Sequence, residues 1–187
     1  MSIVAVKKYK NEIVIGSDSI MVHGWTQEKD RLSKMFKIGK DMVMGTAGEC
    51  RIATLFKDFL SNHKPKYTNE DGYIRLINEF TNEYKDLKGF DPSKNDFIVI
   101  YNKKIFSIND GYHVREIKDY YAIGAGMDYA LAALYNGCDV KKAIETACHL
   151  SIYCEKPINI IKIKTYETQN YNNTNKRKME RSSPETV

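Results

Sequence analysis

The sequence feature that most constrains the fold is a change of hydrophobic period that occurs twice along the chain. The first 47 residues contain short β-branched runs separated by polar turns, which is the pattern of antiparallel strands. Residues 49–62 then carry apolar side chains at helical spacing, and residues 68–87 repeat it, with Ile74 expected on the buried face. This half of the chain therefore predicts a sheet followed by two helices.

The same succession returns in the second half of the chain. Residues 97–123 contain strand-like runs, and two helical segments follow at 128–135 and 140–152. A last β-branched run at 158–163 predicts a final strand. Two sheets, each covered by a pair of helices, satisfy this order. We therefore expect a four-layer αββα sandwich of the α+β class.

Length and composition agree with one globular unit. The chain has 187 residues, of which 42% are hydrophobic, and this suits one domain with a substantial core. Residues 1–167 are predicted to form that domain. Residues 168–187 are rich in Asn, Lys, Arg and Ser, so we expect them to form a disordered tail.

Charge and cysteine content exclude several classes of protein. The net charge of +5 is small and scattered, whereas nucleic-acid binding requires clustered basic residues. No segment reaches the roughly 20 apolar residues of a membrane span, and the chain start lacks the features of a signal peptide. The four cysteines show no C-x-x-C spacing. We therefore expect a cytoplasmic protein with reduced thiols and with neither a nucleic-acid nor a membrane partner.

The sequence lacks the common catalytic motifs, and this directs attention to the chain start. It contains no G-x-S-x-G, no P-loop and no G-x-G-x-x-G motif. Cys148, His149 and Cys154 have a helical context that favours packing over zinc binding. Ser2 would carry a free α-amine once Met1 is removed. Such an amine has a pKa of roughly 7.7–8.0, so its neutral fraction can act as general base for the adjacent hydroxyl.

Two further residues fit this chemistry by their spacing. Asp18 lies sixteen residues after Ser2, and Lys34 lies sixteen residues after Asp18. A lysine near the α-amine disfavours a second ammonium and lowers the pKa of that amine, and an aspartate would orient the lysine. Taken singly, each residue type is common in turns and on surfaces. The combination indicates a nucleophile, its base and two supporting charges.

Four segments around these residues carry a further signal. They are Ile-Val-Ala-Val-Lys at 3–7, Ile-Gly-Ser-Asp at 15–18, Ser-Lys-Met-Phe-Lys-Ile at 33–38 and Met-Gly-Thr-Ala-Gly at 44–48. Together they resemble the proteasome β-subunit and HslV family of N-terminal-nucleophile hydrolases, and the resemblance extends over about residues 2–163. It implies a peptidase in which Ser2 is the nucleophile.

The resemblance also implies roles for other residues and for partners. Asp18 and Lys34 would support the base, and the backbone N–H of Gly48 would bind the oxyanion. Polypeptide substrates, a homo-oligomeric ring and an ATP-dependent unfoldase are implied, and no cofactor is required. In the HslV branch, carbonyls matching those of Cys148, Ser151 and Cys154 bind a monovalent cation, which implies a structural Na⁺ here.

The sequence departs from the family pattern in ways that leave alternatives open. Ser2 replaces the usual Thr, and Ala125 stands where the family has the serine of Ala-Ile-Gly-Ser-Gly. A catalytically inactive ring or scaffold protein, and an amidase acting on a small molecule, are the two alternatives. The register has an alternative as well, because an insertion before Asp18 would place Met1 at the nucleophile position. The gap-free register keeps Ser2, Asp18 and Lys34 at the family spacing, and we prefer it.

Overall fold

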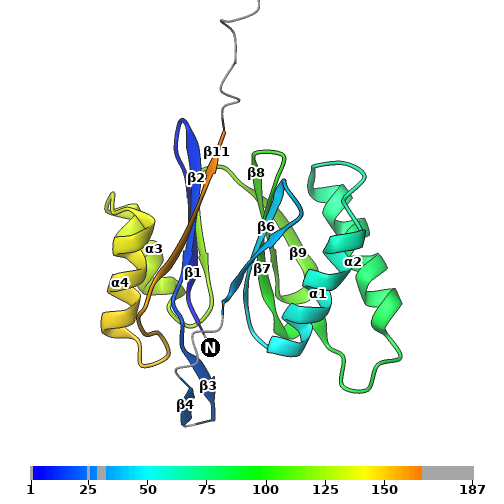
Figure 1. Cartoon of the computed structure of the whole chain (residues 1–187), viewed down its shortest axis with the longest axis horizontal. Coiled ribbons are helices and arrows are strands. Elements are labelled where there is room, and N and C mark those ends of the chain that lie inside the picture. Colours follow the sequence, from blue (N-terminus) through cyan, green and yellow to red (C-terminus); the bar gives the residue numbers. More distant parts are fainter. Residues whose placement is uncertain (1, 25, 29–32, 166–187) are drawn as a thin grey trace, which may run out of the picture.

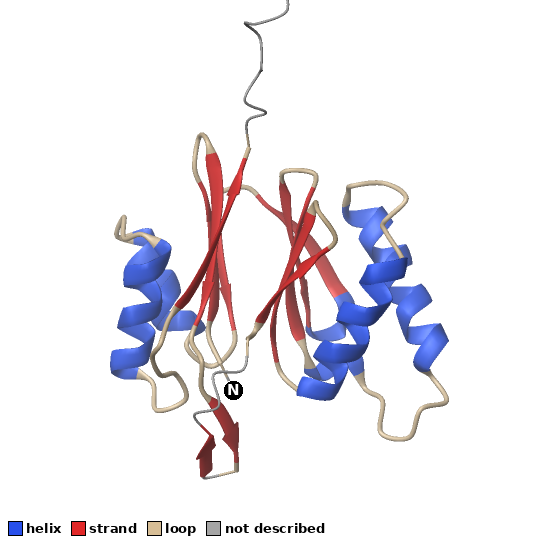
Figure 2. Cartoon of the chain, in the orientation of Figure 1, coloured by secondary structure: helices blue, strands red, loops and turns tan. Residues whose placement is uncertain are grey.

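The structure is a computed structural model that describes residues 2–24, 26–28 and 33–165. Met1 and the predicted tail at 168–187 lie outside the described residues. The chain forms two packed sheets with a pair of helices on each outer side, as Figures 1 and 2 show. The predicted four-layer αββα sandwich of the α+β class is therefore confirmed.

Regular elements appear in the predicted order of strands, helices, strands, helices and strand. The helices are α1 (Cys50–Asn62), α2 (Glu70–Tyr84), α3 (Met127–Tyr135) and α4 (Val140–Leu150). The strands of the N-terminal half are β1 (Val4–Lys8), β2 (Glu12–Ser17), β3 (Met21–His23), β4 (Thr26–Glu28), β5 (Met35–Ile38) and β6 (Met42–Ala47). Those that follow are β7 (Asp96–Tyr101), β8 (Lys104–Asn109), β9 (His113–Ile117), β10 (Tyr120–Ile123) and β11 (Asn159–Lys164).

The two large sheets differ in how they use the ends of the chain. One sheet has the order β10-β1-β2-β11, so the first strand lies inside it and the last described strand forms its edge. The other has the order β5-β6-β7-β8-β9, which follows the chain. Every pairing is antiparallel, and β3 and β4 form a separate hairpin. Strand β1 is thus held on both sides, which fixes the start of the chain.

Three apolar layers hold the sandwich together. Side chains of both sheets, such as Val4 and Ile98, fill the space between them. Phe56 of α1 lies between Phe80 and Phe97, with ring centroids 4.8 and 4.5 Å away, in the layer under α1 and α2. Smaller side chains, including Ala143, fill the layer under α3 and α4. Burial of each large apolar side chain contributes about 1.5–3 kcal/mol to folding.

The predicted apolar face of the second helix is wrong at one position. Ile74 is 42% exposed, whereas Tyr73, Ile77 and Phe80 are buried. The buried face of α2 follows Tyr73, Leu76, Ile77 and Phe80, which lie at helical spacing and pack in the core under α1 and α2, while the Asn69 side chain caps the helix by accepting the N–H of Gly72. Since neighbouring residues on a helix point about 100° apart, Ile74 is turned toward solvent.

One expected element differs in extent. The last helix ends at Leu150 and not at 152, because Ser151 is extended and Ile152 lies 71% exposed in the loop that follows. At the other side of the chain start, the chain leaves the first sheet after Ser17, and β3 pairs with β4 in the separate hairpin.

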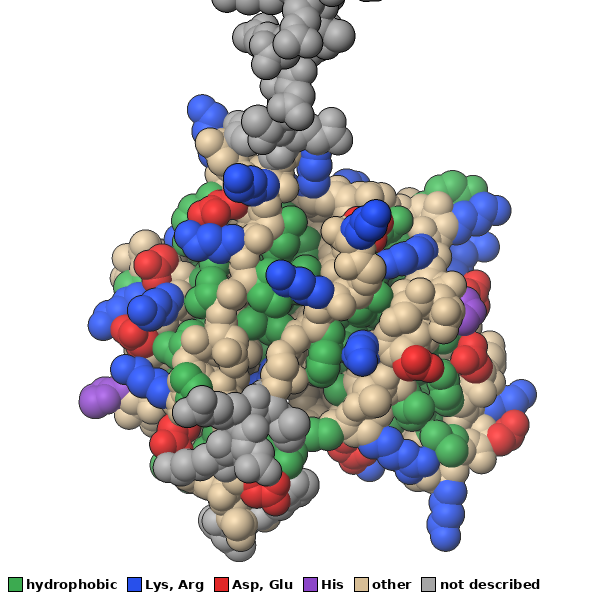
Figure 3. All heavy atoms as spheres, in the orientation of Figure 1, with side chains coloured by type: hydrophobic (Ala, Val, Ile, Leu, Met, Phe, Trp, Pro, Cys, Tyr) green, Lys and Arg blue, Asp and Glu red, His purple; other side chains and the backbone are tan. Residues whose placement is uncertain are grey.

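The surface carries mixed charge. On the face shown in Figure 3, Lys and Arg side chains are distributed among Asp and Glu and do not form a single basic patch. Within the part of the chain that the structure describes, none of the helices has the length and apolar character needed to cross a bilayer.

Candidate active site

Ser2 lies immediately before β1 and is held by the loop between β10 and α3. Its carbonyl accepts a hydrogen bond from the N–H of Gly126 at 3.2 Å. Gly124 has a φ of +93°, and a Cβ at that position would lie 2.4 Å from the Ser2 carbonyl oxygen. A glycine is therefore required for this approach. Ser2 is only 5% exposed, so its backbone and side chain occupy a defined position.

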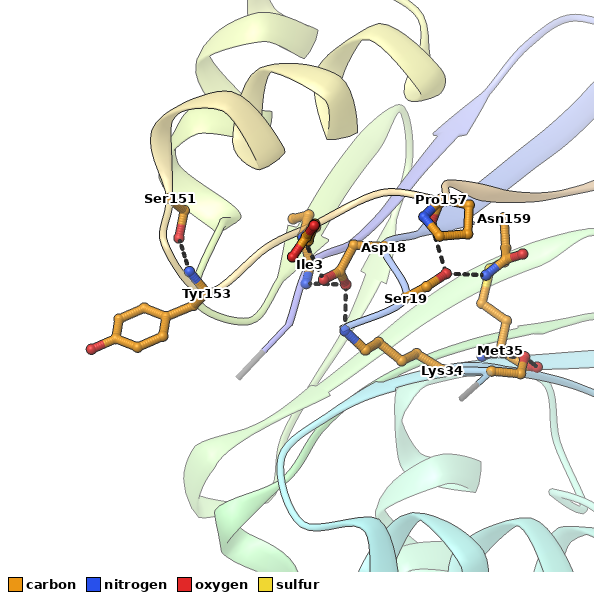
Figure 4. A network of polar contacts seen from close by, with 11 residues as sticks. Ile3, Asp18, Ser19, Lys34, Met35, Ser151, Tyr153, Pro157 and Asn159 are labelled. Carbon is orange, nitrogen blue, oxygen red and sulfur yellow. Dashed lines mark hydrogen bonds and ion pairs between the residues drawn. The ribbon is translucent and has the colours of Figure 1, made fainter. Parts of the chain in front are cut away.

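Asp18 follows the last residue of β2 and is completely buried. Its Oδ1 accepts the backbone N–H of Ile3 at 3.0 Å, next to Ser2 (Figure 4). Its Oδ2 accepts the N–H of Glu155 at 3.3 Å, from the loop after α4. The Asp18 carboxylate therefore ties the chain start to a loop that lies 137 residues beyond Asp18 in the sequence. It is not the turn residue that its local sequence suggests.

Lys34 reaches Asp18 from the opposite sheet. Its Nζ lies 2.6 Å from Oδ1 of Asp18, and the lysine side chain is 10% exposed. The backbone carbonyl of Lys34 accepts the N–H of Thr46 at 2.9 Å, which attaches it to β6. The ion pair thus joins the two sheets at the end of the sandwich where Ser2 lies. Burial raises the pKa of the Asp18 carboxyl, and the Lys34 ammonium and two backbone amides act against that rise.

A pocket of about 580 Å³ opens beside these residues. Ser2, Lys34 and Gly48 all line it, so the structure brings three of the predicted site residues to one cavity. Asp18 supports Lys34 from behind. Much of the rest of the lining is apolar and consists of Ile20, Met21, Val22, Phe36 and Ala53. The cavity can receive an apolar side chain next to a hydroxyl and an ammonium group.

Gly48 connects β6 to the start of α1. Its φ of +134° is a conformation that residues with a side chain rarely adopt. The first N–H groups of a helix have no partner within the helix, and they carry the partial positive charge at the start of the helix dipole. The backbone at Gly48 therefore lies where negative charge on a bound group is stabilised.

Cys148, Ser151 and Cys154 lie in the last turn of α4 and the loop after it. The Ser151 carbonyl accepts the N–H of Cys154 at 3.2 Å, so this segment is a tight turn. Burial, together with the charge of Asp18, raises the pKa of the Cys148 thiol to about 12 and that of Cys154 to about 11. Both thiols are therefore protonated at neutral pH and are poor nucleophiles, in keeping with a packing role.

Sequence reasoning missed two residues at this end of the molecule. Glu155 contributes only its backbone N–H, for which a sequence holds no signal. Asn95 is 2% exposed and contacts the segment around Gly48. It follows Pro-Ser-Lys in a loop, where an Asn is most simply read as a turn residue.

The comparison with known families decides the relationship. A model of the proteasome subunit family matches residues 1–154. The chain belongs to the proteasome subunit family. The resemblance inferred from the sequence is thus confirmed. No curated protein sequence matched the chain.

Solved structures of similar fold cover most of the chain. BPH from Thiobacillus denitrificans in complex with epoxomicin has a TM-score of 0.79 at 18% identity, covering 88% of this chain and 100% of that one. BPH alone gives 0.77 at 16% identity, covering 88% and 98%. Eukaryotic HslV from Trypanosoma brucei gives 0.70 at 19% identity, covering 87% and 99%. This chain and these three solved structures therefore share one fold over nearly the whole described domain.

Proposed function

We propose that this chain is a peptidase that cleaves peptide bonds with Ser2 as nucleophile after Met1 is removed. The observation that carries the proposal is the buried ion pair between Asp18 and Lys34 beside Ser2, on a pocket that Gly48 also lines. Membership of a family of ring-forming peptidases supports the reaction class. The choice of Ser2 rests on the gap-free register and on the place of Ser2 in the pocket.

Each group has a role in the proposed reaction. The neutral α-amine of Ser2 takes the hydroxyl proton as Oγ attacks the carbonyl carbon of the scissile bond. The backbone N–H of Gly48 stabilises the resulting oxyanion. The amine then gives its proton to the departing amino group, and an ester on Ser2 is left for water to hydrolyse. Lys34 keeps the α-amine neutral by its charge, and Asp18 holds Lys34 in place.

The pocket suggests the kind of side chain that the substrate carries. Its walls include Met21, Val22 and Phe36, which favour an apolar side chain by the area they would bury. Thr46 and Cys50 add small polar groups to the lining, and Glu49 and Arg51 add one charge of each sign. We therefore expect cleavage next to apolar residues of medium size.

The proposal extends to assembly and location. Proteasome-type subunits form closed rings, and such rings work with ATP-dependent unfoldases. A homo-oligomeric ring that encloses the Ser2 sites would restrict substrates to unfolded polypeptides delivered by an unfoldase. The cysteines are free thiols, which suits a cytoplasmic location.

A structural monovalent cation is a further part of the proposal. Cys148 lies in the last turn of α4, where carbonyls lack partners within the helix and the helix end carries partial negative charge. Ser151 and Cys154 lie in the loop that follows, and the Ser151 carbonyl has a second lone pair besides the one that accepts the Cys154 N–H. Na⁺ held by these three carbonyls would stabilise the loop that donates the Glu155 N–H to Asp18. Replacing Na⁺ with a larger monovalent cation should then lower the melting temperature.

Peptide hydrolysis by purified protein tests the proposed function. Wild type should cleave fluorogenic peptides with an apolar residue before the scissile bond, and epoxomicin, which is present in one of the similar structures, is a suitable inhibitor to test. Ser2→Ala should reduce kcat to the background rate, and Ser2→Thr should retain activity. Ser61→Ala is a matched control, since Ser61 is an exposed α1 residue that bonds only its own helix. Cleavage by Ser2→Ala at the wild-type rate would refute the assignment.

A further inference from the structure

Asn95 is buried between the end of β6 and the start of α1. It is 2% exposed and lies at the end of a short turn, Pro92–Lys94, that leads into β7. The backbone N–H of Asn95 donates to the Pro92 carbonyl at 3.2 Å, and this bond holds the backbone from which the Asn95 side chain extends. A buried amide of this kind is stable only if its polar atoms find partners.

Among the residues that the structure describes, the partners of the Asn95 side chain belong to the segment that contains Gly48. Nδ2 donates to Thr46 Oγ1 at 3.3 Å and to the Glu49 carbonyl at 3.1 Å. Oδ1 accepts the N–H of Glu49 at 3.0 Å. One side chain therefore holds Thr46 and Glu49, which lie before and after Gly48. The N–H of Glu49 is already used in its hydrogen bond to Asn95.

The packing at Gly48 shows how closely this contact is made. A Cβ on Gly48 would lie 2.5 Å from the Lys94 carbonyl oxygen and 2.6 Å from Cγ of Asn95. The φ of +134° at Gly48 is thus maintained by a turn that presses against it and by hydrogen bonds on both sides. The direction of the Gly48 N–H depends on the same constraints.

We propose that Asn95 is a positioning residue for the oxyanion site, acting through the backbone at residues 46–49. This inference rests on the proposed function, because an oxyanion forms only if Ser2 attacks a carbonyl group. Asn95 touches neither the nucleophile nor the substrate in this role. Without it, the Gly48 N–H would no longer be preorganised toward the place where the negative charge develops.

Two peptide probes with the same sequence separate this role from a general loss of structure. When Ser2 Oγ adds to a peptide aldehyde, the α-amine takes the Oγ proton, the C=O π bond breaks as the C–O bond forms, and negative charge develops on the former carbonyl oxygen before that oxygen is protonated. When Oγ adds to a peptide vinyl sulfone, the same base takes the proton, the C=C π bond breaks, and the charge develops on the carbon beside the sulfone, which then takes up the proton. An oxyanion donor therefore stabilises the first adduct and has little effect on the second, while both reactions need the same nucleophile, base and pocket.

The test compares wild type, Asn95→Ala and Thr46→Val. Loss of one oxyanion donor typically lowers kcat by about 10²–10³-fold, so its misplacement in Asn95→Ala should lower kcat by about 10- to 100-fold, with little change in KM. Affinity for the aldehyde should fall by a similar factor, and the rate of vinyl sulfone labelling should stay within about twofold of wild type. Thr46→Val, which removes one hydrogen bond at nearly constant volume, should give a smaller effect with the same pattern. It also keeps the test valid if Asn95→Ala does not fold.

Asn136→Ala is the matched control, since the Asn136 side chain is exposed and bonds only the Ala132 carbonyl of its own helix. It should match wild type with both probes. An equal loss of aldehyde and vinyl sulfone reactivity in Asn95→Ala, or no loss at all, would overturn the positioning role. If wild type itself reacts with neither probe, the proposed function is wrong and the role of Asn95 falls with it.

Discussion

Replacement of Lys34 by Met should destabilise the fold as well as stop the reaction. Asp18 is fully buried, and Lys34 is the cation within 2.6 Å of it. Removing one member of a buried ion pair typically costs about 3–5 kcal/mol. Asp18 keeps two backbone N–H donors, so we expect the lower end, about 3 kcal/mol. At about 2–4 °C per kcal/mol for a chain of this size, the melting temperature should fall by roughly 10 °C.

The pH dependence of this loss gives a sharper test than its size. Burial raises the pKa of Asp18, and removal of Lys34 takes away the largest opposing contribution and raises it further. An acid whose pKa is higher in the folded chain takes up a proton on folding, so stability rises as the pH falls through that folded pKa. The difference in melting temperature between Lys34→Met and wild type should therefore shrink as the pH is lowered from neutral into the acid range.

A double variant separates charge balance from catalysis. Asp18→Asn with Lys34→Met removes both charges, and it should recover most of the stability because no unpaired carboxylate remains. It should stay inactive, since the charge that lowers the pKa of the α-amine is still missing. Thermal melting at one fixed protein concentration, alongside peptide hydrolysis, measures both effects. A penalty for Lys34→Met that is independent of pH, or full activity in the double variant, would refute this account of the pair.

Three other predictions concern the chain start and the assembly. Gly124→Ala should lower kcat at least about tenfold in the peptide assay, because its Cβ would displace the Ser2 carbonyl; Gly137→Ala, with a φ of +88° and no atom within 4 Å of its Cβ, is the control that carries only the backbone strain. Acetylation of the Ser2 α-amine should abolish turnover and leave the melting temperature unchanged, and a modified protein that still cleaves peptides would contradict the role of the amine. Native mass spectrometry at micromolar concentration should show a closed ring, whereas a uniform monomer of 21.6 kDa would count against assembly.

The layers of the fold could be predicted from the sequence because hydrophobic period is a local property. The apolar spacing becomes helical near Gly48 and returns to that of strands near residue 97, and these two changes are enough to order the elements. The phase of α2 was less accessible. Apolar residues at 73, 74, 76, 77 and 80 allow more than one helical stripe, and packing against the core decides that Tyr73 is buried and Ile74 exposed.

The site was predictable to the extent that it lies in short segments near the chain start. Spacing suggested Asp18 and Lys34 as partners, and the structure places them in contact across the two sheets. The loop residues Asn95 and Glu155 were not predictable, because their contacts with residues 46–49 and with Asp18 arise only when distant loops meet at one end of the sandwich. Local sequence describes both as ordinary loop residues.

Intact mass spectrometry before and after reaction with a peptide vinyl sulfone tests the central claim most directly. The account predicts a chain that has lost Met1 and that gains the mass of one probe, with fragmentation placing the adduct on Ser2. Acetylated protein and Ser2→Ala should both remain unlabelled. A chain that retains Met1 and still cleaves peptides, or an adduct that maps to a cysteine or to any other side chain, would contradict the assignment of Ser2 as nucleophile.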